Sequence, residues 1–398
     1  MKLSVELLNS RGENLLTKEI EISGNSWQKQ TVLLRSPFTD AHSRLRVVLL
    51  TEGTVDMDHI SLFPVKTWKN RENGLRADLA QALYDLNPGV FRFPGGCIIE
   101  GNTLATRYQW KNSVGPVENR PLNENRWNYT FKHKAFPDYF QSLGLGYYEY
   151  FLLSEDLGAE PLPVLSCGLS CQYESNEVVP LDELDLYVQD ALDLIEFAND
   201  PATSTWGKLR AEMGHPEPFH LKMIGIGNEQ WDKVYTERLE VFTKAIRAHY
   251  PDIKIVGSSG PNADGDKFDY LWPEMKRIGV DLVDEHYYMA PDWFFANAAR
   301  YDSYDRRGPK VFAGEYACVD QLQNNFSRRG IKGGRSIEAV LPSHRLAVHL
   351  QTENVGTGIH SIHLLDVNSS GVRIMRRLSN QIRSGFHCQA STWAKSGA

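Results

Sequence analysis

Two glutamates follow short apolar runs that have the pattern of buried strands. Glu229 stands in LKMIGIGNEQWD, after an apolar run with alternating β-branched residues, and Glu315 stands near the end of KVFAGEYA. Catalytic groups in α/β sheets gather where strands end, so both acids are expected at one sheet edge. Two carboxyl groups in that arrangement are the catalytic set of a retaining glycoside hydrolase. The alternative is that each glutamate pairs with an arginine or caps a helix.

In such a hydrolase one carboxyl group protonates the leaving oxygen and the other attacks the anomeric carbon, with roughly 5–5.5 Å between them. Asn228 supplies an amide that can hydrogen-bond to a sugar hydroxyl. His286 and Tyr288, at the end of DEHYY, are expected to donate to the nucleophile or to the sugar. A tyrosine donor would keep Glu315 ionised, whereas a drier setting would keep Glu229 protonated.

Three more side chains near these segments each allow two interpretations. Arg92, in FRFPGG, either contacts a substrate or is a buried structural cation that hydrogen-bonds to carboxylates, and the second is favoured. Trp110 and Trp231 either flank a sugar ring, because aromatic faces suit the C–H-rich side of a sugar, or pack in the core.

The segments that carry these residues alternate between helix and strand. Helical spacing of apolar residues appears over 74–89, 147–159, 181–200, 237–251 and 270–279, and short apolar strands are predicted at 90–96, 161–168, 221–228, 253–258, 280–286 and 310–315. This alternation predicts a parallel sheet buried on both faces. Polar residues at the strand ends, without a Gly-x-Gly-x-x-Gly, favour a (β/α)8 TIM barrel, of which six strands are found.

Residues 1–64 have a different pattern. Short runs such as LSVELL, KEIEIS and KQTVLLR alternate apolar and polar residues between turn-forming residues. They predict antiparallel strands of a β-sandwich, and four or five strands make it a partial one. Trp27 is either a sugar-stacking platform or, as favoured here, a core residue.

Composition limits the classes of partner and cofactor. The 398 residues are enough for a barrel with an appendage, and no run of eighteen apolar residues predicts a membrane span. The start of the chain lacks the apolar core of a signal peptide. A net charge of −7 argues against a nucleic-acid partner. Five irregularly spaced cysteines predict no disulfide framework and no zinc site, so no metal or cofactor is expected.

The charge changes near residue 319. Residues 319–398 hold ten basic and four acidic residues, a net charge of +6 against −7 for the whole chain. Five of the twelve histidines also lie there. We expect a divergent basic tail, either frame-shifted or disordered, with a natural divergent sequence as the alternative.

Six motifs occur in order over residues 56–318: FRFPGGCIIEGN, RYQWKNSVGPVENRP, GLGYYEYFLLSEDLGAEPLPVLSCG, IGIGNEQW, DEHYY and GEYA. Through them the sequence resembles the α-L-arabinofuranosidases of glycoside hydrolase family 51. The segment that begins DMDHISLFPVKTWKN resembles the subgroup in which a carbohydrate-binding β-module is inserted after the first barrel strand. The resemblance implies a (β/α)8 barrel, retention of configuration and release of terminal arabinofuranosyl groups.

The resemblance also implies roles for single residues. Glu229 matches the general acid/base, with Asn228 as the hydroxyl-binding residue before it, and Glu315 matches the nucleophile. His286 and Tyr288 match the family's His-x-Tyr.

Two further positions match the sugar pocket of the family. Cys97 stands where many members have an asparagine that contacts arabinose, and Trp110 matches an aromatic loop residue that lines the pocket. The family's first and eighth barrel strands are not recognisable, so the barrel is expected to be truncated at both ends. The expected domains are a partial sandwich over 1–64, the barrel over 65–318 and the tail over 319–398.

The sequence therefore predicts a retaining hydrolase that acts on an arabinose-containing polysaccharide or oligosaccharide. The alternatives are a related glycosidase that cleaves xylosides or β-glucans, and an inactive carbohydrate-binding fragment. Neither nucleic acid nor membrane is an expected partner. A homo-oligomer is compatible with the resemblance. The compartment is left open, although members with this architecture are often secreted or periplasmic.

Overall fold

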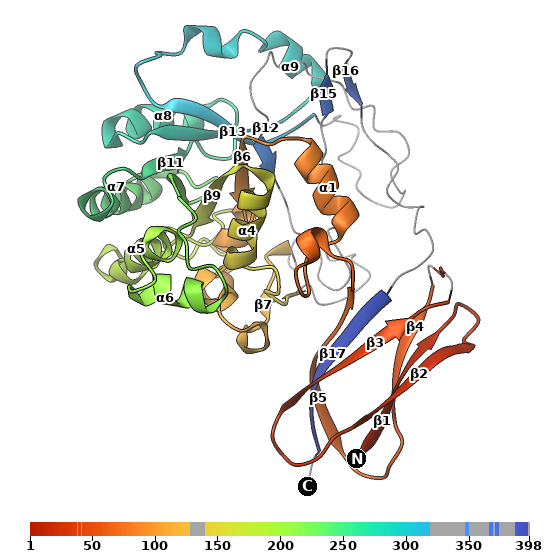
Figure 1. The fold of residues 1–398 in the computed structure, drawn as a ribbon. Coiled ribbons are helices and arrows are strands. Elements are labelled where there is room, and N and C mark those ends of the chain that lie inside the picture. The colour runs from red at the N-terminus through yellow and green to blue at the C-terminus, as the bar shows by residue number, and fades with distance from the viewer. Residues whose placement is uncertain are drawn as a thin grey trace. The chain divides into compact units, whose positions relative to one another are not determined.

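The computed structural model describes residues 1–37, 39–40, 42–127 and 140–318, together with four strands at 347–349, 366–368, 371–373 and 387–396. The chain divides into two compact units (Figure 1), one of Met1–Asp85 with Met375–Ala398 and the other of Leu86–Ile374. These limits differ from the expected 1–64, 65–318 and 319–398. Apart from the four strands, the expected frame-shifted or disordered tail lies outside the described residues.

All six predicted barrel strands are present. They are β6 (Val90–Phe93), β9 (Glu160–Leu165), β10 (Met223–Ile226), β11 (Lys254–Ser258), β12 (Leu282–Met289) and β13 (Lys310–Cys318). They lie in the order β13-β12-β11-β10-β9-β6, each pair parallel, and β14 (Ala347–His349) pairs with the free side of β6. Sequence neighbours are thus sheet neighbours, as in a partial (β/α)8 barrel, and the predicted fold class is confirmed.

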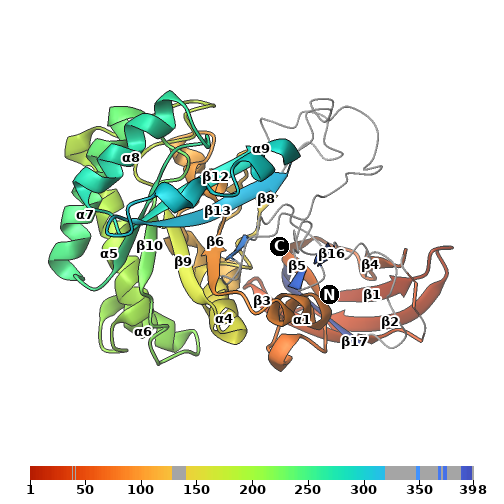
Figure 2. The same ribbon diagram turned by 90° about the horizontal axis from the view of Figure 1, so that it is seen from above.

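Helices alternate with the strands of this sheet, and the longer ones cover its outer side. The helices are α2 (Gly96–Glu100), α4 (Tyr147–Leu157), α5 (Asp185–Asn199), α6 (Thr205–Glu212), α7 (Asp232–His249), α8 (Asp266–Ile278) and α9 (Pro291–Ala296). Figure 2 shows α5, α7 and α8 along the strands. The helices α7 and α8 begin before the predicted residues 237 and 270, because their first turns carry acidic residues that favour a helix N-terminus but break the apolar period. The short helices α6 and α9 were not predicted.

Short elements complete this unit. Single 3₁₀ turns occur at η2 (Leu104–Thr106), η3 (Trp110–Ser113), η4 (Val117–Asn119), η5 (Leu181–Glu183) and η6 (Arg300–Ser303), and two small hairpins pair β7 (Asn123–Glu124) with β8 (Phe140–Gln141) and β15 (Asp366–Asn368) with β16 (Gly371–Arg373). The sheet is buried on both faces: the consecutive residues Phe91, Arg92 and Phe93 of β6, whose side chains alternate between the two faces, are all fully buried. The apolar runs of the sequence therefore correspond to strands covered on both sides.

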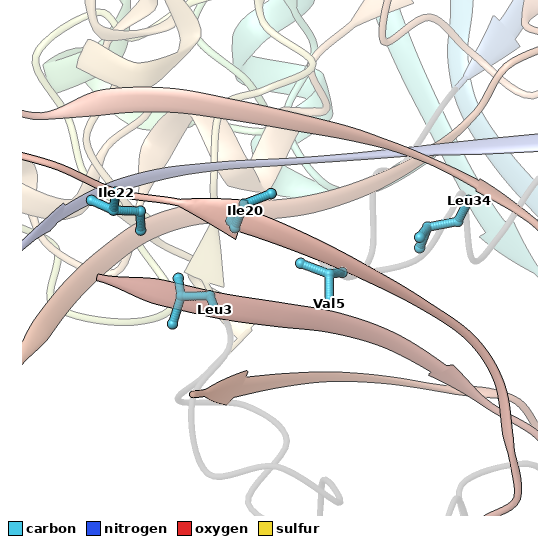
Figure 3. Packing of buried hydrophobic residues seen from close by; sticks show 5 residues of the cluster. All are labelled: Leu3, Val5, Ile20, Ile22 and Leu34. Atoms are coloured by element: carbon cyan, nitrogen blue, oxygen red, sulfur yellow. The ribbon is translucent and has the colours of Figure 1, made fainter. Parts of the chain in front are cut away.

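The other unit is a β-sandwich. One antiparallel sheet has the order β2 (Asn14–Glu21), β1 (Lys2–Leu8), β4 (Arg44–Leu49), and the second has the order β3 (Gln28–Arg35), β17 (His387–Ser396), β5 (Val55–Pro64). Leu3, Val5, Ile20, Ile22 and Leu34 form its core (Figure 3). The unit also contains η1 (Trp68–Asn70) and α1 (Ala77–Asp85), which lies within the predicted helix 74–89.

The C-terminal strand changes the expected boundaries of the sandwich. β17 pairs with β3 on one side and with β5 on the other, so residues of the expected tail complete the second sheet. Without it, β3 and β5 would each present unpaired backbone groups. Trp27 is 46% exposed, so the favoured core position for this side chain is wrong. In the described part of the chain, every helix is too short or too polar to cross a bilayer.

Candidate active site

A tight turn after β10 presents Glu229 at the carboxyl edge of the sheet. Gly227 has φ +75°, and a Cβ there would lie 2.4 Å from Gln230 Oε1 and 2.8 Å from the Tyr235 ring, so this position requires glycine. Glu229 itself has φ +49°, a conformation that costs a non-glycine residue about 1–3 kcal/mol and is typical of functional sites. Asn228 N donates to Gln230 Oε1 at 2.5 Å, which fixes the turn.

Strand β13 places Glu315 level with β12. In the parallel register, His286 lies opposite Glu315 and Tyr288 lies opposite Ala317, after an irregularity between Asp284 and His286. Glu315 is buried. Glu315 therefore lies beside His286, its neighbour on β12.

The two glutamates face one another. A carboxylate oxygen of Glu229, one of Glu315 and a ring nitrogen of His286 all lie within 4.8 Å of each other. His286 Nδ1 is 2.8 Å from Glu229 Oε1 and 3.7 Å from Glu315 Oε2. A retaining glycosidase places its carboxyl groups roughly 5–5.5 Å apart. The geometry therefore suits the two-step displacement that the sequence predicts.

Two donors hold the Glu315 carboxylate. Arg92 Nη1 donates to Oε1 at 3.0 Å, and the Tyr288 hydroxyl donates to Oε2 at 2.8 Å. Arg92 comes from β6 and is fully buried, so it is the carboxylate-bound cation that the sequence favoured. Both contacts stabilise a negative charge on Glu315.

Asp284 belongs to the same network and was missed in the sequence. Its Oδ2 lies 3.1 Å from Arg92 Nε and 3.4 Å from His286 Nε2, and its Oδ1 accepts from Gly314 N at 2.9 Å. Asp284 precedes His286 by two residues on β12, and side chains at that spacing point to the same face of a strand. That spacing within DEHYY was a signal that could have found it.

The buried charges of the site balance. Burial lowers the pKa of His286, but the charges of Glu315 and Asp284, with the hydrogen bond that Nδ1 donates to Glu229, outweigh it and raise the pKa well above its ordinary value. Burial also lowers the pKa of Arg92, while Asp284 and Glu315 raise it above its usual value. Two cations thus lie among three carboxyl groups, so one of the three can hold a proton without leaving a net charge.

Behind Glu229 lie two groups for which burial favours the neutral form. Cys97 Sγ is 3.9 Å from Glu229 Oε2, and burial followed by the charge of Glu100 raises the pKa of this thiol well above its usual range. Burial and then the charge of Glu229 raise the pKa of Glu100 well above its usual range. Cys97 was expected at the sugar pocket and does lie beside Glu229. Glu100 lies in the motif FRFPGGCIIEGN, but the sequence analysis gave it no role.

One of the two polar atoms of the Asn228 side-chain amide has a hydrogen-bond partner among the described residues. Its Oδ1 accepts from Arg92 Nη2 at 2.7 Å, whereas its Nδ2 is buried without a hydrogen-bond partner among the described residues. An unpaired buried donor is costly, so a ligand hydroxyl here would be well bound. A Cβ on Gly96 would lie 1.8 Å from Asn228 Oδ1, so glycine is required for this close approach.

The two tryptophans differ in their surroundings. Trp110 is fully buried, its Nε1 donates to Asp190 O at 2.9 Å and its ring packs on Trp206, which corrects the expectation that it lines the sugar pocket. The aromatic loop folds inward because the Trp110 indole finds both apolar neighbours and a carbonyl there. Trp231, two residues after Glu229, lies at the sheet edge with Lys267 Nζ 3.3 Å from its ring centroid.

Glu229, His286 and Glu315 also have the atom types of a metal site. Their neighbours argue for another use: Arg92 and Tyr288 already donate to Glu315, and His286 is held as a cation. A divalent ion at this position would lie next to two positive charges. The arrangement fits a pair of catalytic carboxyl groups better than a metal centre.

Comparison with known proteins agrees with this geometry. The family model of the alpha-L-arabinofuranosidase 1 domain matches residues 82–306. An extracellular exo-alpha-L-arabinofuranosidase of Streptomyces chartreusis is 44% identical over 335 residues, which are 81% of this chain and 39% of that protein. Alpha-L-arabinofuranosidase 1 of Arabidopsis thaliana is 39% identical over 323 residues, which are 80% of this chain and 44% of that protein.

A solved structure extends the similarity to the fold. The arabinose-bound MgGH51 α-L-arabinofuranosidase has a TM-score of 0.64 and 30% identity, over 81% of this chain and 50% of that one. The chain therefore spans half or less of the length of each of these three relatives.

Proposed function

The chain belongs to the α-L-arabinofuranosidases of glycoside hydrolase family 51, and on that premise we propose that it releases terminal α-L-arabinofuranosyl groups from arabinose-containing glycans with retention of configuration. The observation that carries this proposal is the pair of opposed carboxyl groups, Glu229 and Glu315, with oxygens within 4.8 Å of each other.

Glu315 acts as the nucleophile. It accepts hydrogen bonds from Arg92 and Tyr288, which stabilise its negative charge and fix the direction of its oxygens. One oxygen of Glu315 forms a bond to the anomeric carbon while the bond to the leaving oxygen breaks. The product of this step is a covalent arabinosyl–enzyme ester.

Glu229 acts first as an acid and then as a base. It gives its proton to the leaving oxygen, and in the second step it takes a proton from the water that cleaves the ester. The total charge of the three carboxyl groups is the same in both steps, so the buried cations Arg92 and His286 balance it in each. When Glu315 becomes an ester it loses its negative charge, and Glu229 gains one by losing its proton. Together with Asp284, one ionised glutamate balances the two cations throughout.

Asn228 and Tyr288 are the proposed sugar-binding side chains. The unpaired Nδ2 of Asn228 is placed to donate to a hydroxyl next to the anomeric carbon, a contact that strengthens as positive charge develops there. Tyr288 is half exposed and its hydroxyl donates a hydrogen bond to Glu315. Its ring therefore borders the space between Glu229 and Glu315. Cys97 contributes a weak donor beside Glu229.

The test is hydrolysis of a nitrophenyl α-L-arabinofuranoside by the wild type and by Glu229→Ala, Glu315→Ala and Glu212→Ala. Glu212 lies on α6 with an exposed side chain and is the matched control. We expect both site variants to lose at least about 10³-fold in turnover and the control to keep it. Azide should restore turnover of the aryl substrate in Glu229→Ala with retention of configuration, because it attacks the ester without a general base, whereas any arabinosyl azide formed by Glu315→Ala should have the inverted configuration. Equal activity in all four proteins would reject the assignment.

The same assay separates the alternatives. Faster turnover of aryl β-xylosides or β-glucosides would assign the machinery to another sugar. Zero turnover of every aryl glycoside by a folded wild type, together with retention on arabinoxylan, would identify a carbohydrate-binding fragment.

A further inference from the structure

A hollow lies at the edge of the barrel sheet where the strands begin, opposite the edge that carries Glu229 and Glu315. It encloses about 820 Å³ where β11, β12 and β13 begin, between the end of α8 and the loop before β13. Lys254 and Lys310 are the first residues of β11 and β13, and the register places Leu282 of β12 opposite Lys310 on one side and Val256 of β11 on the other. Since the strands are parallel, Glu315 lies at the other end of β13, about 16 Å from Lys310 at ~3.3 Å per residue.

The lining of this hollow is positively charged. Lys254, Lys276, Arg307 and Lys310 contribute cations, and Asp281 and Asp305 contribute the carboxylates, so two positive charges are in excess. The whole chain has a net charge of −7. An excess of positive charge in a concave surface attracts anions, although the net charge of the whole chain is negative.

The two acids are already occupied within the protein. Asp281 Oδ2 accepts from Ile255 N at 2.9 Å and lies 3.5 Å from Arg247 Nη2. Asp305 Oδ1 accepts from the backbone and the side chain of Arg307 at 3.0 and 3.2 Å. These contacts hold the strand starts and the loop in place. The hydrogen bond from Arg307 N is the largest cause of the lowered pKa of Asp305, and the charges of Lys276 and Lys310 are smaller causes.

Two of the lysines remain available to a ligand. Among the described residues, neither Lys254 nor Lys276 forms an ion pair, and Lys276 Nζ only lies over the Trp272 ring at 5.7 Å from its centroid. Both side chains are exposed. An anionic ligand in the hollow would therefore gain two charged contacts without breaking an existing pair.

The size and charge of the hollow select the class of anion. A volume near 820 Å³ is that of a site for a ligand of two or three sugar rings, and a small inorganic ion would leave most of it to water. Gly279, at the C-terminal end of α8, borders the hollow, and the partial negative charge of a helix C-terminus disfavours a doubly charged phosphate. A nucleic acid carries about one charge per 1.7 Å, far more than two excess cations can balance.

We propose that this hollow is a second glycan-binding site, which takes a uronate-bearing oligosaccharide segment. Singly charged carboxylates on the sugar rings contact Lys254 and Lys276, and the ring hydroxyls meet the remaining polar groups. The site faces away from Glu229 and Glu315, so a polysaccharide bound there is tethered to the protein without blocking hydrolysis.

The test measures trigalacturonate binding by calorimetry at low ionic strength. Lys276→Glu should weaken binding about ten-fold, and Lys254→Glu should do the same, because each replaces an attractive charge by a repulsive one near the ligand. Lys208→Glu, which makes the same charge change at an exposed site on α6, is the matched control and should bind like the wild type. Added salt should weaken wild-type binding.

Several outcomes would overturn the proposal: no binding of trigalacturonate to the wild type, equal weakening by Lys208→Glu, or equal affinity for a neutral trisaccharide or a short DNA duplex. Hydrolysis of the aryl arabinofuranoside, measured on the same samples, should be unchanged in all three variants. That assay keeps the two proposals separate, because turnover without trigalacturonate binding rejects only the second site, and binding without turnover rejects only the catalytic assignment.

Discussion

Asp284 and His286 lie two residues apart on the same face of β12, with Asp284 Oδ2 3.4 Å from His286 Nε2. The other ring nitrogen of His286 contacts Glu229 at 2.8 Å, so the imidazole connects Asp284 to the proposed acid/base. Asp284 also lies beside Arg92, which holds Glu315. The buried Asp284 carboxylate thus contacts His286, the partner of Glu229, and Arg92, the partner of Glu315.

The first prediction concerns Asp284→Asn. Because the folded-state pKa of His286 is raised above its ordinary 6.5, the imidazolium contributes stability fully below that pH and loses it as pH rises through the raised value. Removing the Asp284 charge should lower the pKa of His286, so the stability that the imidazolium contributes should be lost at a lower pH. We also expect the protein to lose about 3–5 kcal/mol of unfolding free energy, since two buried cations lose an anion.

The measurement is the imidazole NMR titration of His286 together with urea unfolding across pH. Asp266→Asn, at the exposed start of α8, is the control. A His286 resonance that titrates at the same pH in the wild type and in Asp284→Asn would contradict the role given to Asp284.

The second prediction concerns Tyr288→Phe. The hydroxyl donates to the Glu315 carboxylate, and a hydrogen bond to a charged group is worth about 1.5–3 kcal/mol. We expect kcat/KM for an aryl arabinofuranoside to fall by about 10- to 100-fold. Tyr270→Phe, which removes a half-exposed hydroxyl on α8, should leave kcat/KM unchanged. Equal rates in the two variants would remove Tyr288 from the site.

The third prediction concerns Gly96→Ala. The added Cβ would lie 1.8 Å from Asn228 Oδ1, and Asn228 is itself held by Arg92. Displacing Asn228 should lower kcat/KM, and overpacking should cost about 1–3 kcal/mol in thermal or urea unfolding. Gly144→Ala is the control, because its nearest neighbour would be Ser142 Oγ at 3.4 Å. A fully active and stable Gly96→Ala would show that Asn228 can move without consequence.

The fourth prediction concerns Glu100→Gln. Burial raises the folded-state pKa of Glu100 well above its ordinary 4.5, so its favourable contribution is complete below that pH and is lost as pH rises through the raised value. The wild type should therefore lose stability toward alkaline pH more steeply than Glu100→Gln, which stays neutral. Urea midpoints between pH 5 and 9 measure this, with exposed Glu212→Gln as the control. Parallel curves for Glu100→Gln and the wild type would contradict the assignment.

The sequence predicted the local structure of the barrel well. Strand and helix alternation follows from apolar periodicity, which depends on neighbouring residues alone, and all six predicted strands form the sheet. The turn after β10 was recognisable because Gly227 ends an apolar run directly before Asn228 and Glu229. The same local pattern did not reveal α6 or α9, since short helices carry little periodic signal.

What the sequence by itself determined was which residues stand at the strand ends, because the chain's own periodicity sets where a strand stops. The tertiary structure alone decided how they combine: Arg92 lies 223 residues before Glu315 and 136 before Asn228, yet it contacts both. It also buried Trp110 and placed β17 between β3 and β5. Such pairings depend on which buried groups and open strand edges meet in space, and the free energy of a buried charge depends on all its neighbours at once.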